Sequence, residues 1–164
     1  MEFKQVTDKA AAKFLFTQAY LTDDENANNY SPEQFEESWN KWLGFFTLSD
    51  GDKVVAFCGV RDFGDYARIF DRYFVVPDTR QDGLGNNQYV LDIINPILEH
   101  VGGKIPFFSI EGEDRRNTME RTIEVINDCL DEDAQFHLLD GMHETVPGSW
   151  QNIAIQKPHD TFKI

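Results

Sequence analysis

The sequence feature that most constrains the fold is an apolar run that ends at a proline and leads into a glycine-bearing turn. Residues 73–76 are apolar, Pro77 follows, and Arg80, Gly83 and Gly85 come shortly afterwards. Beyond them, apolar residues recur at helical spacing. A strand, a glycine turn and a helix N-terminus together present backbone N–H groups and a favourable dipole to an anion, so the stretch predicts a phosphate-binding turn. Glycine permits positive φ and the close approach of a ligand.

Two other phosphate-binding motifs are excluded at this turn. The dinucleotide fingerprint G-x-G-x-x-G needs a third glycine, but position 88 is Gln. The P-loop needs Gly-Lys-Ser/Thr, which does not follow. An isolated G-x-G also occurs in ordinary turns, so its interpretation depends on the rest of the chain.

Length and composition indicate one folded, acidic domain over residues 1–164. The chain is 41% hydrophobic and 13% aromatic, which favours a packed core over disorder. It has no apolar stretch of membrane-spanning length and no signal-peptide pattern, so we expect a cytoplasmic protein with no membrane partner. The net charge of −14 disfavours nucleic acid as a partner and is compatible with a cationic one, although it also serves solubility.

The cysteines and histidines predict neither a metal site nor a covalent mechanism. Cys58 and Cys129 lie in apolar contexts, which favours buried, reduced thiols. No histidine lies close to either cysteine in sequence, so a nucleophilic role is not expected. The four histidines show no metal-ligand spacing with them.

Periodicity and capping signals predict four helices and six strands. The predicted helices cover residues 8–21, 32–43, 86–100 and 114–130. The predicted strands cover residues 45–48, 53–61, 66–76, 105–110, 136–139 and 152–156. Ser31 is the expected N-cap of the second helix, whose apolar stripe includes Trp42 and Leu43 before Gly44 ends it. Residues 141–149 read as a polar excursion.

This order of elements, together with the Arg-x-x-Gly-x-Gly pattern at Arg80, Gly83 and Gly85, resembles the GCN5-related N-acetyltransferase (GNAT) family over essentially the whole chain. The resemblance implies an α/β (α+β) fold: a mixed, mostly antiparallel sheet with helices on both faces and a central parallel pair splayed around a cofactor cleft. It also implies an acyl-CoA-dependent N-acyltransferase that transfers directly to a primary amine, with acetyl-CoA as the expected co-substrate. The acceptor is expected to be cationic, and the protein a monomer or homodimer.

The resemblance further implies which residues bind the cofactor. Backbone N–H groups of the glycine turn would hold the pyrophosphate, and two valines at the preceding strand end would pair with the pantetheine amides. The implied residues are Val75, Val76, Arg80, Gln81, Asp82, Gly83, Leu84, Gly85, Asn86 and Asn117. For Asn117, near the start of the last helix, an exposed first-turn residue is an equally good interpretation.

Transfer to an amine requires a base, an oxyanion donor and a proton for the leaving thiolate. Asp71 is the first candidate base, because strand alternation would place it on one face with Tyr73 and Val75. Glu111, at the end of the strand over residues 105–110, is the second. Tyr73 is the candidate proton donor. The alternative for Asp71 is an exposed carboxylate paired with an arginine, and for Tyr73 a core position.

Two residues depart from the family pattern. Asp82 places a carboxylate in the turn predicted to bind phosphate, where it costs Coulomb energy unless it points to solvent. Glu124 stands where the family often has a tyrosine as general acid. These departures leave open a rival hypothesis, an inactive binding module with a vestigial cradle, and a weaker third, an acidic mimic of nucleic acid. Residues 22–42 and 140–151 are expected to select the acceptor.

Overall fold

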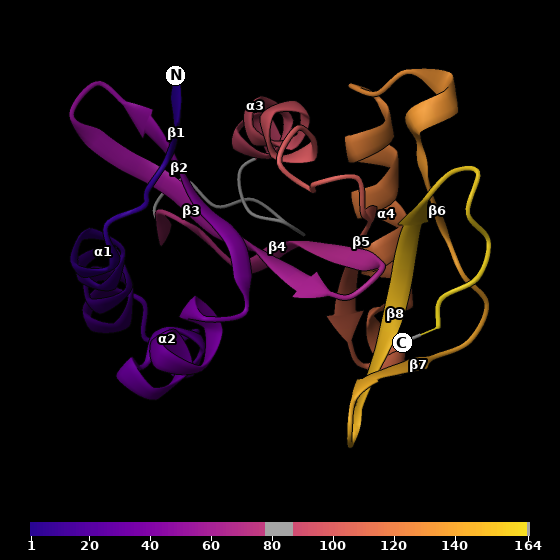
Figure 1. Cartoon of the computed structure of the whole chain (residues 1–164), viewed down its shortest axis with the longest axis horizontal. Coiled ribbons are helices and arrows are strands. Elements are labelled where there is room, and N and C mark those ends of the chain that lie inside the picture. Colours follow the sequence, from indigo (N-terminus) through magenta and orange to yellow (C-terminus); the bar gives the residue numbers. More distant parts are fainter. Residues whose placement is uncertain (78–86, 164) are drawn as a thin grey trace.

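The computed structural model describes residues 1–77 and 87–163, which form one mixed sheet with helices on both faces (Figure 1). The strands are β1 (Glu2–Gln5), β2 (Trp42–Asp50), β3 (Lys53–Phe63), β4 (Tyr66–Val75), β5 (Ile105–Glu111), β6 (Phe136–Leu138), β7 (His143–Val146) and β8 (Ser149–Gln156). The helices are α1 (Lys9–Thr22), α2 (Pro32–Trp39), α3 (Asn87–Leu98) and α4 (Arg116–Asn127). None of these helices is long and apolar enough to cross a membrane.

The strands pair in the order β1-β2-β3-β4-β5-β8-β6, and β7 also pairs with β8. β4 and β5 are parallel, whereas every other pair described is antiparallel. A parallel pair needs a crossover connection, and α3 lies in that connection. The predicted fold class, a mostly antiparallel sheet with one central parallel pair, is confirmed.

Helices α1 and α2 cover one face of β2, β3 and β4 through an aromatic cluster. Phe16 of α1 contacts Phe35 of α2 edge-on, with ring centroids 5.2 Å apart, and stacks on Phe57 of β3 at 5.3 Å. Ser31 caps α2 as predicted, because its hydroxyl accepts the N–H of Gln34 at 3.3 Å. This packing holds the segment between α1 and α2 beside β4.

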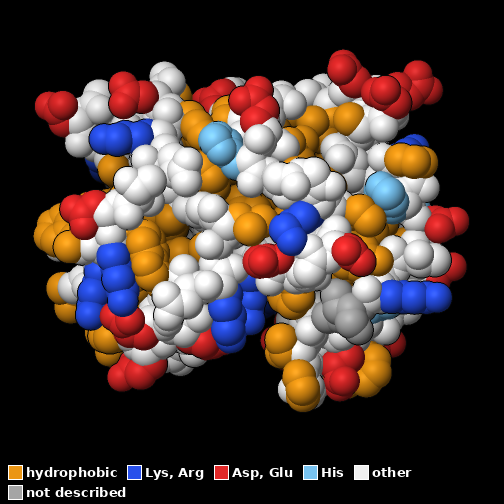
Figure 2. All heavy atoms as spheres, in the orientation of Figure 1, with side chains coloured by type: hydrophobic (Ala, Val, Ile, Leu, Met, Phe, Trp, Pro, Cys, Tyr) orange, Lys and Arg blue, Asp and Glu red, His pale blue; other side chains and the backbone are white. Residues whose placement is uncertain are grey.

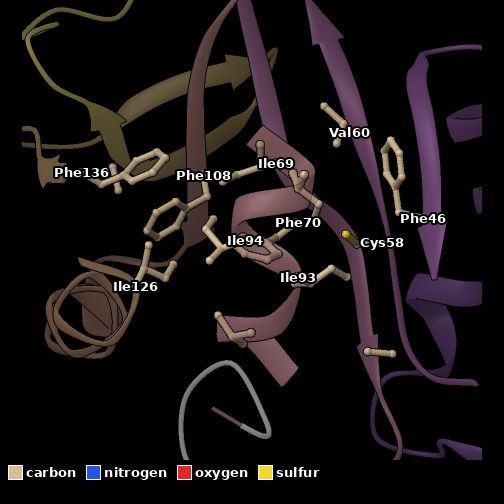
Figure 3. Packing of buried hydrophobic residues seen from close by; sticks show 14 of the residues in the cluster. Phe46, Cys58, Val60, Ile69, Phe70, Ile93, Ile94, Phe108, Ile126 and Phe136 are labelled. Carbon is tan, nitrogen blue, oxygen red and sulfur yellow. The ribbon is translucent and has the colours of Figure 1, made fainter. Parts of the chain in front are cut away.

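Helices α3 and α4 cover the opposite face through a second, larger core. Figure 3 shows Ile94 of α3, Phe70 of β4 and Phe108 of β5 pointing into the same space. The rings of Phe70 and Phe108 meet edge-on with centroids 6.1 Å apart. The core of this face therefore ties β4 to β5 by side chains at a point beyond their backbone pairing.

The predicted extent of the second helix is wrong. α2 ends at Trp39, and Trp42 begins β2, where it pairs with Arg61 of β3. The indole of Trp42 lies against the backbone of Gly59, where an added Cβ would come within 2.2 Å of the indole nitrogen. The helical spacing of Trp39 and Trp42 was thus coincidental.

Strands β1 and β7 were not predicted. Each has four residues, and each pairs at the border of the sheet, β1 with β2 and β7 with β8. β7 and the turn that follows it lie within the predicted polar excursion, and β8 begins at Ser149, ahead of the strand predicted over residues 152–156. Short edge strands carry too few residues for an alternating pattern to stand out.

Two backbone irregularities interrupt β4. Phe70 and Arg72 have φ of 58° and 54°, a region that residues other than glycine seldom adopt. The register with β3 shifts at both places, since β4 uses three residues where β3 uses two. These are β-bulges, which bend a strand and re-aim its side chains.

The bulges contradict the predicted alternation of Asp71 with Tyr73 and Val75. Asp71 contacts Trp42 on the face that α1 and α2 cover, whereas Tyr73 and Val75 pack with the core beneath α3 and α4. Simple alternation fails because each bulge adds a residue to the strand.

The ladder between β4 and β5 stops just before the bulges. It comprises the pairs Tyr66↔Ile105, Ala67↔Pro106 and Arg68↔Phe107. After Arg68 the two strands part, and the parallel pair is splayed, as expected from the sequence.

Candidate active site

A cleft of about 640 Å³ lies where β4 and β5 part. Its walls come from both strands, from the end of β3, from the α1–α2 segment and from the β7–β8 hairpin. Figure 2 shows the surface hollowed at its lower edge, between the half that carries α2 and the half that carries this hairpin. The lining includes Arg61, Arg68, Arg72, Tyr73, Glu111 and Gln151.

The open edge of β4 borders this cleft. The carbonyl of Tyr73 accepts the hydroxyl of Tyr30 at 2.8 Å, so the α1–α2 segment reaches β4 here. The N–H of Val76 donates to the carbonyl of Val55 in β3 at 3.0 Å. Of the two valines predicted to meet the pantetheine arm, Val75 lies in the lining of the cleft, whereas the N–H of Val76 is used in pairing with β3.

The structure separates the three candidate catalytic residues. Tyr73 and Glu111 both line the cleft, and Glu111 is exposed at the end of β5. Asp71 lies beneath the lining with 1% of its surface exposed. Its carboxylate accepts from Arg68 Nη1 at 2.7 Å and from the indole N–H of Trp42 at 2.8 Å. Asp71 is therefore paired with an arginine, as the alternative interpretation proposed, but in a buried rather than an exposed position.

Most of the predicted cofactor-binding residues cannot be placed. Residues 80–86, from Arg80 to Asn86, lie outside the described residues. Asn117 is exposed as the second residue of α4 and is not part of the lining of the cleft.

The cleft is lined by three arginines that were not assigned to the site from the sequence. Arg61 lies 4.0 Å from the carboxylate of Glu37, and Arg68 is paired with Asp71. Arg61 and Arg68 are opposite each other in the β3–β4 ladder. That register follows from the Asp62–Asp65 turn, which was predicted, so pairing the strands across the turn is the signal that could have brought these two arginines together.

Arg72 is held differently, by neutral side chains from the α1–α2 side. Its Nη2 donates to Gln34 Oε1 at 2.5 Å. Weaker bonds run from Nε to the Ser38 hydroxyl at 3.4 Å and from Nη1 to Asn29 Oδ1 at 3.5 Å. Burial lowers the pKa of Arg72, and the nearby Asp71 carboxylate opposes that effect. An arginine remains charged despite such a shift, so a positive charge is fixed in this wall.

The wall formed by β5 and β8 carries oxygen atoms instead. Glu111 of β5 is opposite Gln151 of β8 in the ladder. Gln151 is 7% exposed, and its Oε1 and the hydroxyl of Ser109 have no hydrogen-bond partner among the described residues. Buried polar atoms normally have partners, so these two oxygens are suited to a ligand or ordered water.

Neither cysteine is poised as a nucleophile. Cys58 is fully buried, and burial raises the pKa of its thiol. Burial also raises the pKa of the Cys129 thiol. Among the described residues no three His, Cys, Asp or Glu side chains are grouped so that they could hold a metal ion.

Solved structures, but no family model or curated protein, share this architecture. No family model and no curated protein matches the chain. Solved structures do match. The aminoglycoside 6′-N-acetyltransferase of Enterococcus faecium superposes with a TM-score of 0.60 at 16% identity, over 94% of this chain and 96% of that one. The ribosomal-protein-S18-alanine N-acetyltransferase of Escherichia coli gives 0.52 at 17% identity, over 99% and 96%.

A third similar structure names the family directly. A putative acetyltransferase from the GNAT family of Bacteroides thetaiotaomicron gives a TM-score of 0.55 at 11% identity, over 99% of this chain and 89% of that one. Likeness at such low identity concerns the fold and not the substrate. The chain has the fold of the GNAT acetyltransferases, as the order of its elements and its Arg-x-x-Gly-x-Gly turn predicted.

Proposed function

We propose that this protein is an acyl-CoA-dependent N-acyltransferase that uses acetyl-CoA and acylates a primary amine by direct transfer. The observation that carries the proposal is the parting of β4 from β5 beside a cleft that both strands line. Ligands of α/β sheets bind at the carboxyl ends of parallel strands, next to the crossover helix. Acetyl-CoA supplies the acyl group as a thioester.

The chain would hold this co-substrate through backbone groups. Val75, at the end of β4 in the lining of the cleft, would pair with an amide of the pantetheine arm, as the sequence predicts. The turn at residues 80–86 would bind the pyrophosphate, which is a prediction from its sequence and its place before α3.

Two side chains have positions suited to moving protons. Glu111 is exposed at the cleft, so its carboxylate can take a proton from an incoming ammonium group directly or through water. Tyr73, whose hydroxyl oxygen is buried behind the lining, is the candidate donor of a proton to the departing sulfur. Asp71 is better suited to positioning, because Arg68 and Trp42 occupy its carboxylate oxygens. Since both thiols are buried to some degree and have raised pKa values, transfer without a cysteine intermediate is favoured.

Calorimetric titration with acetyl-CoA tests the cradle. We expect micromolar binding by the native chain and its loss in a Gly83→Glu, Gly85→Glu double variant, because added carboxylates repel the pyrophosphate and fill its space. A Thr17→Glu, Thr161→Glu variant adds the same charge at exposed positions away from the cleft and should bind normally. If the native chain shows no binding at millimolar acetyl-CoA, the enzyme proposal fails and the chain is a binding module of this fold.

Glu111→Gln tests the base. Loss of the Glu111 carboxylate should lower kcat by roughly 100-fold or more, which is the usual contribution of a general base. Because Glu111 is exposed, the affinity for acetyl-CoA and the melting temperature should stay close to those of the native protein. Glu113→Gln, an exposed neighbour, is the matched control. A rate unchanged in Glu111→Gln would exclude this residue as the base.

A further inference from the structure

Resting on the proposed function, we infer that the acceptor is a zwitterionic amine: a molecule that carries a carboxylate besides the amino group to be acylated. The carboxylate binds at Arg72, on the β4–α2 wall of the cleft, and the amino group lies towards Glu111 and Gln151 on the β5–β8 wall. The inference depends on how the charges of the lining are already paired.

Among the described residues, Arg72 is the lining guanidinium that makes no ion pair, although the Asp71 and Glu37 carboxylates lie nearby. Arg68 has the carboxylate of Asp71 at 2.7 Å, and Arg61 shares that of Glu37 at 4.0 Å. Within residues 1–77 and 87–163, no carboxylate oxygen lies within 4.0 Å of a nitrogen of Arg72. Partly buried cations are normally paired, so Arg72 is the lining residue suited to an incoming anion.

The neutral partners of Arg72 also fix its orientation. Gln34 and Ser38 of α2 accept its Nη2 and Nε hydrogens, and the strained backbone at Arg72 aims the side chain to this side of β4. A guanidinium held in place loses little conformational freedom on binding and can offer its remaining donors to a planar carboxylate. The wall is thus preorganised for one oxyanion.

The charge balance of the cleft selects a single negative charge. Glu25, Glu37 and Glu111 line the cleft and Asp71 lies directly behind it, so four carboxylates accompany the three arginines. A dianionic phosphate would meet about twice the repulsion that a carboxylate meets there, because it carries two charges where a carboxylate carries one. The lining therefore favours a carboxylate over a phosphate.

The opposite wall is suited to the amino group. The Glu111 carboxylate and Gln151 Oε1, which finds no partner among the described residues, both accept hydrogen bonds. An ammonium group offers only donors and carries the charge that Glu111 attracts. The three lining arginines thus lie on one wall, and the acceptors Glu111 and Gln151 lie on the other, which matches a molecule with both charges.

Matched pairs of amines test the inference on the native protein. Thiol release from acetyl-CoA is measured with glycine, 3-aminopropanoate, 4-aminobutanoate and L-phenylalanine, each beside the amine of the same skeleton that lacks the carboxylate. We expect kcat/KM to be at least about tenfold higher for the carboxylate-bearing member of the best pair, because a charge-assisted bond to arginine contributes at least that factor. Equal or faster turnover of the simple amines would overturn the inference but leave the proposed function intact.

Variants at Arg72 then test the assigned residue. Arg72→Gln should abolish the preference, chiefly through KM for the carboxylate-bearing amine, and Arg72→Lys should restore part of it. Arg121→Gln, on the exposed side of α4, removes the same charge elsewhere and should keep the preference. A preference retained in Arg72→Gln would reject the assignment. If no amine of either kind releases thiol, the proposed function itself fails, and this inference with it.

Discussion

At the scale of single residues, the most informative group is the buried carboxylate of Asp71. It has two donors, one from a guanidinium and one from an indole, and it lies directly behind the lining of the cleft. Removing its charge would leave Arg68 without its counter-ion in a partly buried site. Asp71 thus contacts Arg68 and Trp42 and is itself buried beneath the lining of the cleft.

Asp71→Asn should lower the free energy of unfolding by about 1–3 kcal/mol, because a charge-assisted hydrogen bond is replaced by a neutral one in a buried place. Urea unfolding measures the change. Asp52→Asn removes an exposed carboxylate and should shift stability by less than about 0.5 kcal/mol. A change in Asp71→Asn no larger than in this control would show that the buried pair adds little to stability.

The sequence located part of the site at this scale. Tyr73 and Glu111 line the cleft because each lies towards the end of a strand, and strand ends were predicted within a few residues. The face of Asp71 could not be predicted, since the positive φ of Arg72 has no signature in a residue that is not glycine. The position of Arg72 in the lining of the cleft was missed for the same reason.

At the scale of elements, close side-chain contacts as well as backbone hydrogen bonds fix how β2, β3 and β4 are aligned. Gly59 of β3 is opposite Asp71 in the β3–β4 ladder, and the indole of Trp42 lies against Gly59. The absence of a side chain at Gly59 lets the indole reach the carboxylate. One glycine therefore sets how the first residue of β2 meets the bulge of β4.

Gly59→Ala should destabilise the protein by roughly 1–3 kcal/mol, because the new methyl group would overlap the indole and push it from Asp71. Chemical denaturation of a double-mutant cycle with Trp42→Phe checks the cause. The glycine substitution should cost clearly less in the Trp42→Phe background, since the smaller ring leaves room. Equal costs in both backgrounds would mean that the indole is not the group displaced.

Elements with a strong local sequence signal were predicted correctly. Elements whose limits depend on contacts with other strands were not. Ser31, Pro32 and Gln34 marked the start of α2, and the hairpin between β2 and β3 followed from Asp50 and Gly51. The end of α2 was missed because Trp42 has helical spacing but gains more from pairing with β3. β1 and β7 were missed because four residues at a sheet edge show no pattern of their own.

At the scale of the whole molecule, the acidic chain encloses a cleft with three arginines. The net charge is −14, because the chain has 29 acidic and 15 basic residues. A protein-wide field favours the approach of a cation, whereas the groups in contact with a ligand decide which part of it binds where. An acceptor with both charges is compatible with both levels.

Because like charges repel across the surface, the melting temperature should rise when NaCl is increased from about 50 to 500 mM, as screening shortens the Debye length below the spacing of most surface charges. Scanning calorimetry measures the shift. A variant with the exposed residues Asp131, Glu132 and Asp133 changed to their amides should start from a higher melting temperature and respond less to salt. A melting temperature that falls with salt would indicate that attractive pairs dominate the surface.

The limited pairing of β4 with β5 has a consequence for how such a chain can diversify. Backbone bonds join the two halves of the sheet over only the first three residues of β4, and beyond that point each half presents its own wall. Apart from Tyr30, which donates to the Tyr73 carbonyl, and β8, which pairs with β5, the α1–α2 segment and the β7–β8 hairpin can therefore change in length and residue type without disturbing the strand edges between them. In evolutionary terms, acceptor choice and donor binding would be separable traits in an enzyme of the proposed kind. New acceptors would be acquired through surface segments while the edges of β4 and β5 stay the same.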